Sequence, residues 1–462
     1  MITNKMSNIR VGIYTRERFR AVFHGEYKHG EEVISGEKEI CEAGWYIPTS
    51  EDCSFSLMDV TIGIDFHWER NETQTFKGSL EVMKAKNGEL TAVNVLDIED
   101  YLQSVISSEM SATSHMELLK AHAVISRSWA LCKIQRSLQG SAFACQESEG
   151  KRICWYGSEP HEGFDVCADD HCQRYQGLRA KDHKNAIKAV NETKGLILAY
   201  KENPTPNSDY EICDARFYKC CGGVTEEFET CWEDTHFDYL VKVEDNDANR
   251  SLSLSNLCAS REQSQVCLNF AEAQPKILKG PIEETISTKQ SLDLTTEEGA
   301  REWIMSSPEA FCNTNDKKIL SQVLNDYDQE TIDFYRWKVV YSQEELTSLV
   351  ARHAPQLGKI IDLIPLKRGV SGRIYELKIV GENESIIIGK ELEIRKWLSN
   401  SHLYSSAFVI EKEGETFTLY GAGWGHGVGL CQIGAAVMAE KGYTYKEILA
   451  HYYPNTILYE QL

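Results

Sequence analysis

No stretch of the 462 residues is apolar for the roughly 18 to 20 positions that a membrane-spanning helix needs. The longest apolar runs, such as 386–388, are only as long as part of a strand, so we expect no membrane span. The first ten residues lack the apolar core of a secretory signal, and the sequence therefore predicts no export signal at this end. With only 10 prolines and 42% hydrophobic residues, collagen-like and disordered classes are excluded.

Positive charge is scarce relative to negative charge. The chain has 49 Lys and Arg against 70 Asp and Glu, a net charge of -21. Such a chain repels phosphate backbones, so we expect no nucleic-acid partner. A local group of Lys or Arg can still bind an acidic substrate, because distant surface charge is screened.

Cysteine is too sparse for a small disulfide-stapled protein: there are 15 in 462 residues, an odd number that leaves at least one thiol unpaired within the chain. Many fall between residues 145 and 231. They are candidates for metal ligands, for disulfides between loops, or for small buried apolar side chains, and the sequence leaves these open.

The pattern of elements predicts an α+β fold of roughly two to four domains. Short β-type runs extend to about residue 95, helical periodicity follows, and β-type alternation returns after residue 334. We expect a β-rich N-terminal domain, a mixed catalytic core in two parts, and a polar inserted lobe between those parts. Their predicted bounds are 1–94 for the N-terminal domain, 95–245 and 334–462 for the core, and 246–333 for the lobe.

The first predicted helix covers residues 97–110 and ends in a carboxylate on its apolar side. Leu102, Val105 and Ile106 form a stripe at i, i+3 and i+4, and Glu109 occupies the i+7 position of that stripe. A carboxylate held near the core pays a desolvation penalty that suits a general acid. The alternative is a helix-terminal Glu that turns toward water.

A second predicted helix begins at a Ser114 to Glu117 capping box and carries Arg127 on a mostly apolar body. Arg127 lies eighteen residues, or about five helical turns, after Glu109. A buried guanidinium needs an anionic partner. That partner is Glu109, a substrate carboxylate or a structural acid.

Glycine alternates with larger residues over Gly421–Gly429, a segment that displays Trp424 and His426. Such a backbone can approach a ligand closely, although a plain tight turn is the competing interpretation. The segment has neither the spacing of a dinucleotide-binding loop nor a GK[ST] ending, so a nucleotide site is not indicated.

Imidazole and thiol groups gather in a short stretch at His161, Cys167, His171 and Cys172. These ligand types suit tetrahedral zinc, and we take His161, Cys167 and His171 as candidate ligands. No C-x2-C pair is present, so a loop with incidental thiols is the alternative.

The sequence resembles the stage II sporulation protein D (SpoIID/LytB) family through motifs in matching order. The motifs are 100–110 (DYLQSVISSEM), 119–127 (LKAHAVISR), 220–232 (CCGGVTEEFETCW), 423–435 (GWGHGVGLCQIGA) and 447–454 (EILAHYYP). The family is known for lytic transglycosylases that cut peptidoglycan glycan strands, and related members are associated with amidase enhancement. The resemblance implies that Glu109 is the catalytic acid/base and that Arg127 is the helical arginine of the site.

The resemblance also implies a glycan-binding role for the Gly-rich loop and its neighbours. The substrate-binding candidates are Lys219, Trp424, His426, Gly425, Gly427 and Gln432. We expect the Gly-rich loop to lie beside Glu109, with Trp424 stacking on a sugar ring and His426 orienting a hydroxyl or Glu109. Around residues 221–225 family members vary in their polar or basic residues, and Val224 of this chain carries no charge. Lys219 and Arg216, which lie nearby in the sequence, are therefore candidates for a third catalytic group.

We therefore expect a lytic transglycosylase that makes 1,6-anhydro-MurNAc ends, with peptidoglycan strands as its partner. The chemistry requires no cofactor, and a structural zinc is implied by family members that bind zinc in the corresponding segment. Two alternatives stay open: a non-catalytic glycan-binding or amidase-activating module, and a zinc-dependent cell-wall hydrolase. The family implies the cell envelope, whereas the missing signal leaves a cytoplasmic location open.

Overall fold

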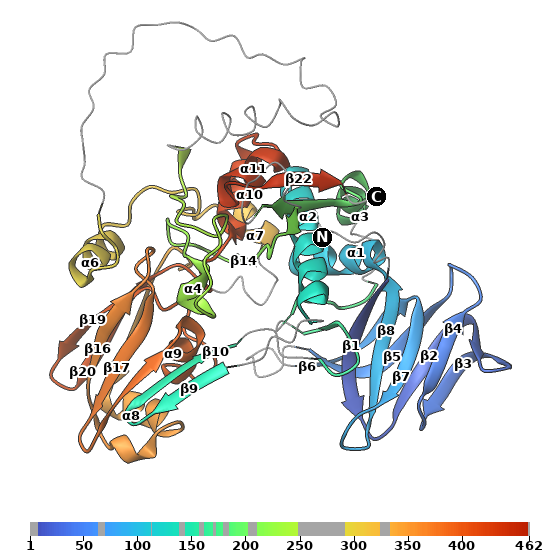
Figure 1. Cartoon of the computed structure of the whole chain (residues 1–462), viewed down its shortest axis with the longest axis horizontal. Helices are drawn as coiled ribbons and strands as arrows, with labels where there is room; N and C mark the ends of the chain where they lie inside the picture. The colour runs from blue at the N-terminus through green and yellow to red at the C-terminus, as the bar shows by residue number, and fades with distance from the viewer. Residues whose placement is uncertain are drawn as a thin grey trace, which may run out of the picture.

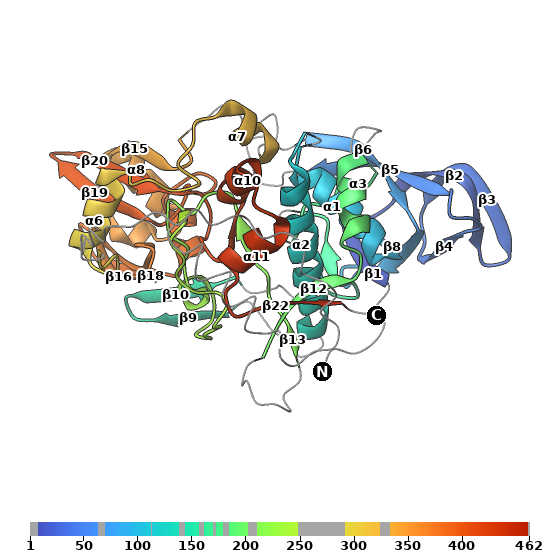
Figure 2. The ribbon, with the colours of Figure 1, turned by 90° about the horizontal axis from the view of Figure 1, so that it is seen from above.

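The computed structural model describes residues 8–62, 70–111, 113–137, 144–156, 161–169, 172–178, 184–201, 210–247, 292–323 and 333–460. It confirms the α+β class. A group of helices lies between an N-terminal sheet on one side and a second, C-terminal lobe on the other (Figures 1 and 2). No helix in the described ranges is both long enough and apolar enough to cross a membrane.

The N-terminal part is one twisted sheet. Its strands are β1 (Asn8–Arg16), β2 (Phe19–His29), β3 (Glu32–Ile40), β4 (Gly44–Pro48), β5 (Ser54–Ile62), β6 (Arg70–Lys77), β7 (Ser79–Lys84) and β8 (Leu90–Asp97). The order is β11-β1-β8-β7-β4-β2-β5-β6, with β3 on β2. The short β11 (Val166–Cys167) comes from much later in the chain and lies parallel to β1, so the sheet holds the segment with the candidate zinc ligands.

The central helices pack on one another, and the first of them also packs on β1 and β8 of this sheet. They are α1 (Ile98–Glu109), α2 (Met116–Ser137), α3 (Lys184–Glu192), α10 (Gln432–Glu440) and α11 (Tyr445–Tyr452). Asp97 caps α1 by accepting from the backbone N–H of Glu99. The predicted capping box of the second helix is wrong: the helix begins at Met116, and the Ser114 hydroxyl donates to the carbonyl of Gln322 at 2.7 Å instead.

Two small sheets join the middle of the chain to its C-terminal part. Strand β12 (Leu196–Tyr200) pairs with β13 (Glu211–Ile212) and with β22 (Ile457–Glu460). Strand β14 (Phe217–Tyr218) lies parallel to β21 (Leu430–Cys431), directly after the Gly-rich segment. This second pairing fixes the end of the Gly-rich loop against the residues that precede Lys219.

The C-terminal lobe has its own hydrophobic core. It contains β15 (Arg336–Ser342), α8 (Gln343–Ala351), β16 (Ile360–Arg368), β17 (Ile374–Gly381), β18 (Ser385–Gly389), α9 (Glu391–Trp397), β19 (Phe408–Glu413) and β20 (Thr416–Ala422). Its larger sheet is completed by a hairpin from the first half of the chain, β9 (Ala144–Ser148) and β10 (Lys151–Trp155), and β10 lies parallel to β18.

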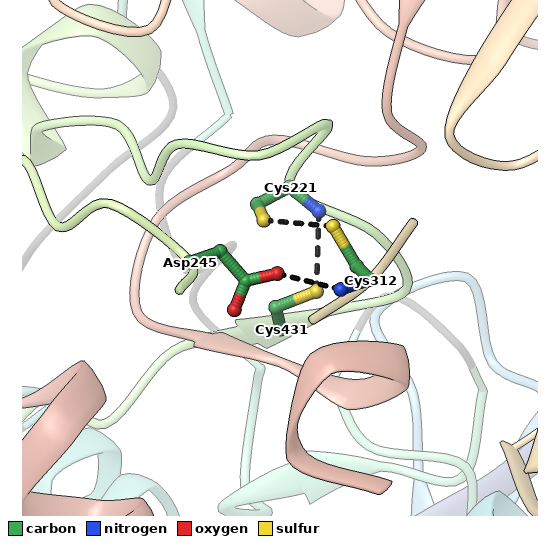
Figure 3. A group of neighbouring side chains, drawn as sticks. All are labelled: Cys221, Asp245, Cys312 and Cys431. Atoms are coloured by element: carbon green, nitrogen blue, oxygen red, sulfur yellow. Dashed lines mark hydrogen bonds between the residues drawn. The ribbon is translucent and has the colours of Figure 1, made fainter. Parts of the chain in front are cut away.

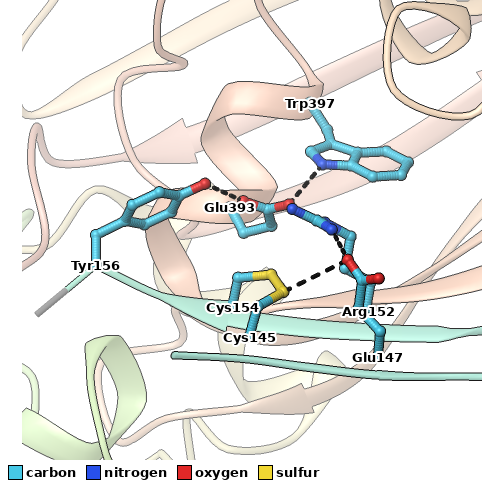
Figure 4. The surroundings of a disulfide bond; sticks show 7 residues. All are labelled: Cys145, Glu147, Arg152, Cys154, Tyr156, Glu393 and Trp397. Carbon is cyan, nitrogen blue, oxygen red and sulfur yellow. Dashed lines mark hydrogen bonds and ion pairs between the residues drawn. A yellow bond between two sulfur atoms is a disulfide. The ribbon is translucent and has the colours of Figure 1, made fainter. Parts of the chain in front are cut away.

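A disulfide links the two strands of that hairpin, and a buried carboxylate holds the hairpin on the lobe (Figure 4). Cys145 and Cys154 face each other across the hairpin and are bonded. Arg152 donates to Glu393 of α9 at 2.8 Å, and Glu393 also accepts from Trp397 at 2.9 Å. The ion pair thus joins residues that are more than two hundred positions apart, whereas the disulfide closes the hairpin on itself.

The segment 246–333, which we expect to form an accessory lobe, is described only in part. Residues 248–291 lie outside the described residues. Of the remainder, α6 (Glu297–Ser306) packs on β19 and β20, as its Thr296 cap predicts a helix there, and α7 (Lys317–Val323) packs on α10. Leu320 and Val323 are fully part of the main hydrophobic core, so this end of the segment belongs to the body of the protein.

Candidate active site

Glu109 is the last residue of α1, and its side chain is half-buried. Its Oε1 accepts a hydrogen bond from the backbone N–H of Arg174 at 3.1 Å. Among the described residues, no other hydrogen bond to this carboxylate is found, so Oε2 remains available to a ligand. A carboxylate that is oriented on one oxygen and accessible on the other fits a group that exchanges a proton with a substrate.

The segment 173–177 runs along α1 and holds that carboxylate in place. Tyr101 donates to the side chain of Gln173 at 3.1 Å, and the Ser104 hydroxyl donates to the carbonyl of Gly177 at 2.8 Å. The backbone N–H of Gln176 donates to the hydroxyl of Ser108 at 3.3 Å. These contacts fix the segment at both ends and therefore fix the Arg174 N–H that orients Glu109.

The predicted zinc ligands His161 and Cys167 lie together at the start of this segment, with Cys172 as the third member. The ligand atoms of the three residues are all within 4.8 Å of one another. His171, the third residue predicted, lies outside the described residues. Imidazole nitrogen and two thiol sulfurs at such distances fit tetrahedral zinc.

Arg127 is buried but does not contact Glu109. It donates to both carboxylate oxygens of Glu99, at 2.9 and 2.6 Å, and to the carbonyl of Leu196 at 2.9 Å. Glu99 stands at the opposite end of α1, about 15 Å along the helix from Glu109. Of the three partners expected for Arg127, the structure thus provides the structural acid, and the geometry does not favour a catalytic role.

Lys219 contacts the end of α7, and the same end of α7 contacts the residues that follow Glu109. Its Nζ donates to the carbonyl of Val323 at 2.6 Å. The preceding carbonyl, of Gln322, accepts from the backbone N–H of Ser111 at 3.0 Å, two residues after Glu109. Adjacent carbonyls of one segment therefore bring a half-buried ammonium and the candidate acid/base into the same neighbourhood.

The Gly-rich loop needs glycine for contact with the protein itself. Gly425 and Gly427 have φ values of +99° and +88°, a region that L side chains rarely adopt. A Cβ on Gly427 would lie 2.4 Å from Cζ of Arg373, which is fully buried and donates to the carbonyl of Gly425 at 3.2 Å. The close approach predicted for a sugar is thus made, at Gly427, by a guanidinium that the sequence analysis missed, since nothing near Arg373 in the sequence marks it.

His426 is occupied by the backbone on both ring nitrogens. Nε2 contacts the carbonyl of Phe217 at 3.0 Å, and Nδ1 accepts from the N–H of Val428 at 3.1 Å, which assigns the neutral Nε2–H tautomer. Burial, with the nearby Arg216 and Arg373 guanidinium groups, lowers the pKa of His426 well below its usual value. The ring therefore stabilises its loop, and these contacts compete with the predicted hydrogen bond to Glu109 or a hydroxyl.

Trp424 and Gln432 also have protein partners. The half-buried Trp424 ring stacks on Phe334 with centroids 4.7 Å apart, which leaves part of its surface for a ligand. Gln432 is buried, and its Nε2 donates to Nε2 of His122 at 3.1 Å, between α10 and α2. Gln432 therefore joins two helices of the core.

Two parts of the chain match known protein families. Residues 86–200, which include Glu109, Arg127 and the His161 to Cys172 cluster, match the family model described as stage II sporulation protein. Over this segment the chain is similar to the stage II sporulation protein family. Residues 226–429 match a second model, described as a domain of unknown function (DUF8618), which covers β15 to β20 of the C-terminal lobe and the whole of the Gly-rich loop.

Three curated relatives extend the match. The amidase enhancer of Bacillus subtilis (strain 168) is 24% identical over 359 residues, 77% of this chain and 40% of that protein. Stage II sporulation protein D of the same organism is 37% identical over 89 residues, 18% of this chain and 26% of that protein. An uncharacterized protein of Brachyspira hyodysenteriae (strain ATCC 49526 / WA1) is 24% identical over 369 residues, 79% of this chain and 68% of that protein. The chain thus spans 40% of the length of the first relative and 26% of the length of the second.

Proposed function

We propose that this chain is a lytic transglycosylase that cleaves the bond between N-acetylmuramic acid and N-acetylglucosamine in peptidoglycan, with Glu109 as its general acid and base. The observation that carries the proposal is the half-buried Glu109 carboxylate, which is oriented through Oε1 by the Arg174 N–H and has no further hydrogen bond among the described residues. Its place within the segment that matches the SpoIID model supports a cell-wall substrate.

One carboxyl group is sufficient for this reaction. Glu109 protonates the oxygen of the leaving sugar while the glycosidic bond breaks. The resulting carboxylate then takes the proton of the C6 hydroxyl of the muramic acid, whose oxygen closes the 1,6-anhydro ring. Because the nucleophile belongs to the substrate, it is already held near the reacting carbon, and no water enters the products.

Lys219 is our candidate for substrate binding. Muramic acid carries a lactyl carboxylate, and the ammonium of Lys219 lies in the neighbourhood of Glu109 through Gln322 and Val323. A point charge there can attract an anionic strand to a protein whose overall charge is -21.

We further propose that zinc bound by His161, Cys167 and Cys172 fixes the segment whose backbone orients Glu109. Cys172 lies two residues before Arg174, whose N–H orients Glu109. A metal that fixes Cys172 also fixes the start of the segment along α1. In this role zinc positions a hydrogen bond and takes no part in the chemistry.

Glu109→Gln is the direct test. The amide keeps the shape and can still accept from Arg174 but cannot hold and release the proton, so product formation should fall at least a thousandfold. The measurement is mass spectrometry of the products from glycan strands without peptides, where anhydro ends are lighter than hydrolysed ends by one water. Glu99→Gln, at the other end of the same helix, is the matched control: it should lower the melting temperature and leave the products unchanged.

Cleavage at an undiminished rate by folded Glu109→Gln would refute the mechanism. Hydrolysed rather than anhydro ends from the unmodified protein would refute the reaction class. If neither protein cleaves strands and both bind them equally, the chain is a binding or amidase-activating module.

A further inference from the structure

Three cysteines and an aspartate converge behind the Gly-rich loop (Figure 3). The thiol sulfurs of Cys221, Cys312 and Cys431 and a carboxylate oxygen of Asp245 all lie within 4.8 Å of one another, and all four residues are buried. The sulfurs of Cys221 and Cys312 are 3.3 Å apart. Four ligand atoms around one zinc at 2.0 to 2.3 Å lie roughly 3.5 to 4 Å apart, so the cluster has the size of a tetrahedral site.

Backbone N–H groups already point at the sulfurs. Cys431 Sγ accepts from the N–H of Cys221 at 3.2 Å and from that of Gly434 at 3.4 Å. Cys221 Sγ accepts from the N–H of Gly223 at 3.3 Å. Such donors stabilise negative sulfur and are typical of the outer shell of thiolate metal sites.

The carboxylate of Asp245 is oriented in the same way. One oxygen accepts from the hydroxyl of Tyr452 at 2.6 Å, and the other accepts from the N–H of Cys312 at 2.9 Å. His451 Nε2 lies 4.0 Å from Asp245 and is buried, with no hydrogen-bond partner among the described residues. An unpartnered buried nitrogen beside the cluster indicates that its polar contacts are incomplete without a further group.

We propose that Cys221, Cys312, Cys431 and Asp245 bind a structural zinc ion. Thiolate ligands select zinc over magnesium and calcium, and four protein ligands leave no open position for catalysis. The ion would be separate from the one proposed at His161, Cys167 and Cys172, and this inference does not rest on the proposed function.

The proposed ion would connect the segments that carry Lys219 and the Gly-rich loop. Cys221 lies two residues after Lys219, and the neighbouring Cys220 pairs with Trp424 through two backbone hydrogen bonds of 2.8 and 3.0 Å. Cys431 ends the Gly-rich loop and caps α10. Cys312 belongs to the segment that leads into α7. One ion would thus fix three chain segments that are remote in sequence.

The test is zinc content of the full chain, purified under reducing conditions, with Cys172→Ser as the reference so that the other candidate site is removed. We expect about one zinc per reference chain, almost none after the additional Cys312→Ser change, and about one after Cys213→Ser, a buried cysteine outside the cluster. Should Cys312→Ser fail to fold, cobalt added to the metal-free reference chain should give the intense absorption of tetrahedral thiolate ligation.

Full zinc content after the Cys312→Ser change would overturn the proposal. So would a reference chain without zinc and without a cobalt–thiolate spectrum, including one whose mass is lower by two hydrogens because Cys221 and Cys312 form a disulfide. Iron in place of zinc would overturn the assignment of the metal.

Discussion

Arg127 binds Glu99 through two parallel hydrogen bonds, of 2.9 and 2.6 Å, and so joins α2 to the beginning of α1. The backbone N–H of Gly195 also donates to Glu99, at 3.2 Å, and the guanidinium reaches the carbonyl of Leu196. The pair therefore connects two helices to the start of β12. Glu109 depends on this connection only through the helix that carries it.

Arg127→Lys tests that separation. An ammonium cannot form the two parallel bonds, so the free energy of unfolding should fall by about 2 to 4 kcal/mol. Turnover per folded molecule should stay within about twofold, because Glu109 keeps its hydrogen bond. Denaturant unfolding and a product assay on the same sample measure both quantities. A large loss of turnover at unchanged stability would show instead that Arg127 acts on the substrate.

Gly427→Ala should destabilise the protein by about 2 to 4 kcal/mol, since the new methyl group meets the buried guanidinium of Arg373 and the backbone has positive φ. Gly414→Ala is the control. Gly414 also has positive φ, +60°, but nothing lies within 4 Å of its Cβ position, so about 1 kcal/mol is expected. Equal melting temperatures for the two variants would contradict the proposed packing.

His122 should make the fold sensitive to acid. Burial, and next the nearby Lys219, lowers the pKa of His122 to about 3, whereas an unfolded chain has a His pKa of about 6.5. Between these values the unfolded chain binds a proton that the folded chain does not. Stability is therefore full above pH 6.5 and falls as the pH drops toward 3, by up to about 4 kcal/mol from this residue.

The measurement is the free energy of unfolding against pH for the unmodified protein and for His122→Gln. The variant should be less stable at neutral pH, because Gln432 loses its acceptor, and its pH dependence should be flatter. The same slope in both proteins would assign the acid sensitivity to other residues.

Cys172→Ser should slow turnover through Arg174. Loss of the proposed zinc frees the start of the segment along α1, and we expect turnover to fall at least about tenfold with a smaller change in substrate affinity. Cys53→Ser, a buried cysteine of the N-terminal sheet, is the control. If Cys172→Ser loses its metal and retains full turnover, the cluster does not position Glu109.

Local signals were sufficient for several helices. The helix predicted over 97–110 is found at Ile98–Glu109 with the expected Asp97 cap, and the two C-terminal helices begin at Gln432 and Tyr445. Periodicity and caps lie within a few residues of each other, so a sequence shows them directly. By contrast, β3 has the charged, mostly exposed sequence EVISGEKEI, and its hydrogen bonds to β2 rather than its side chains make it a strand.

The site could be predicted only in part. The sequence marks Glu109 because a carboxylate interrupts an apolar stripe, and its catalytic role stays a prediction. Arg373, Asp245 and Cys312 were missed, since each becomes significant only when the fold brings it to the Gly-rich loop. The partner of Arg127 was open for a related reason: Glu99 and Glu109 lie on one helix, and only the crossing of α1 and α2 decides between them.

The parallel pairing of β10 with β18 has a consequence for the autonomy of the C-terminal lobe. The segment 226–429 that matches a single family model does not include the hairpin at residues 144–155. If this segment were expressed alone, the backbone donors and acceptors of β18 would form an unpaired sheet edge. Such an edge can pair with the same edge of another copy. Two strands of the lobe's larger sheet, β9 and β10, belong to the segment that matches the SpoIID model. We therefore expect residues 86–200 and 226–429 to be inherited and expressed together.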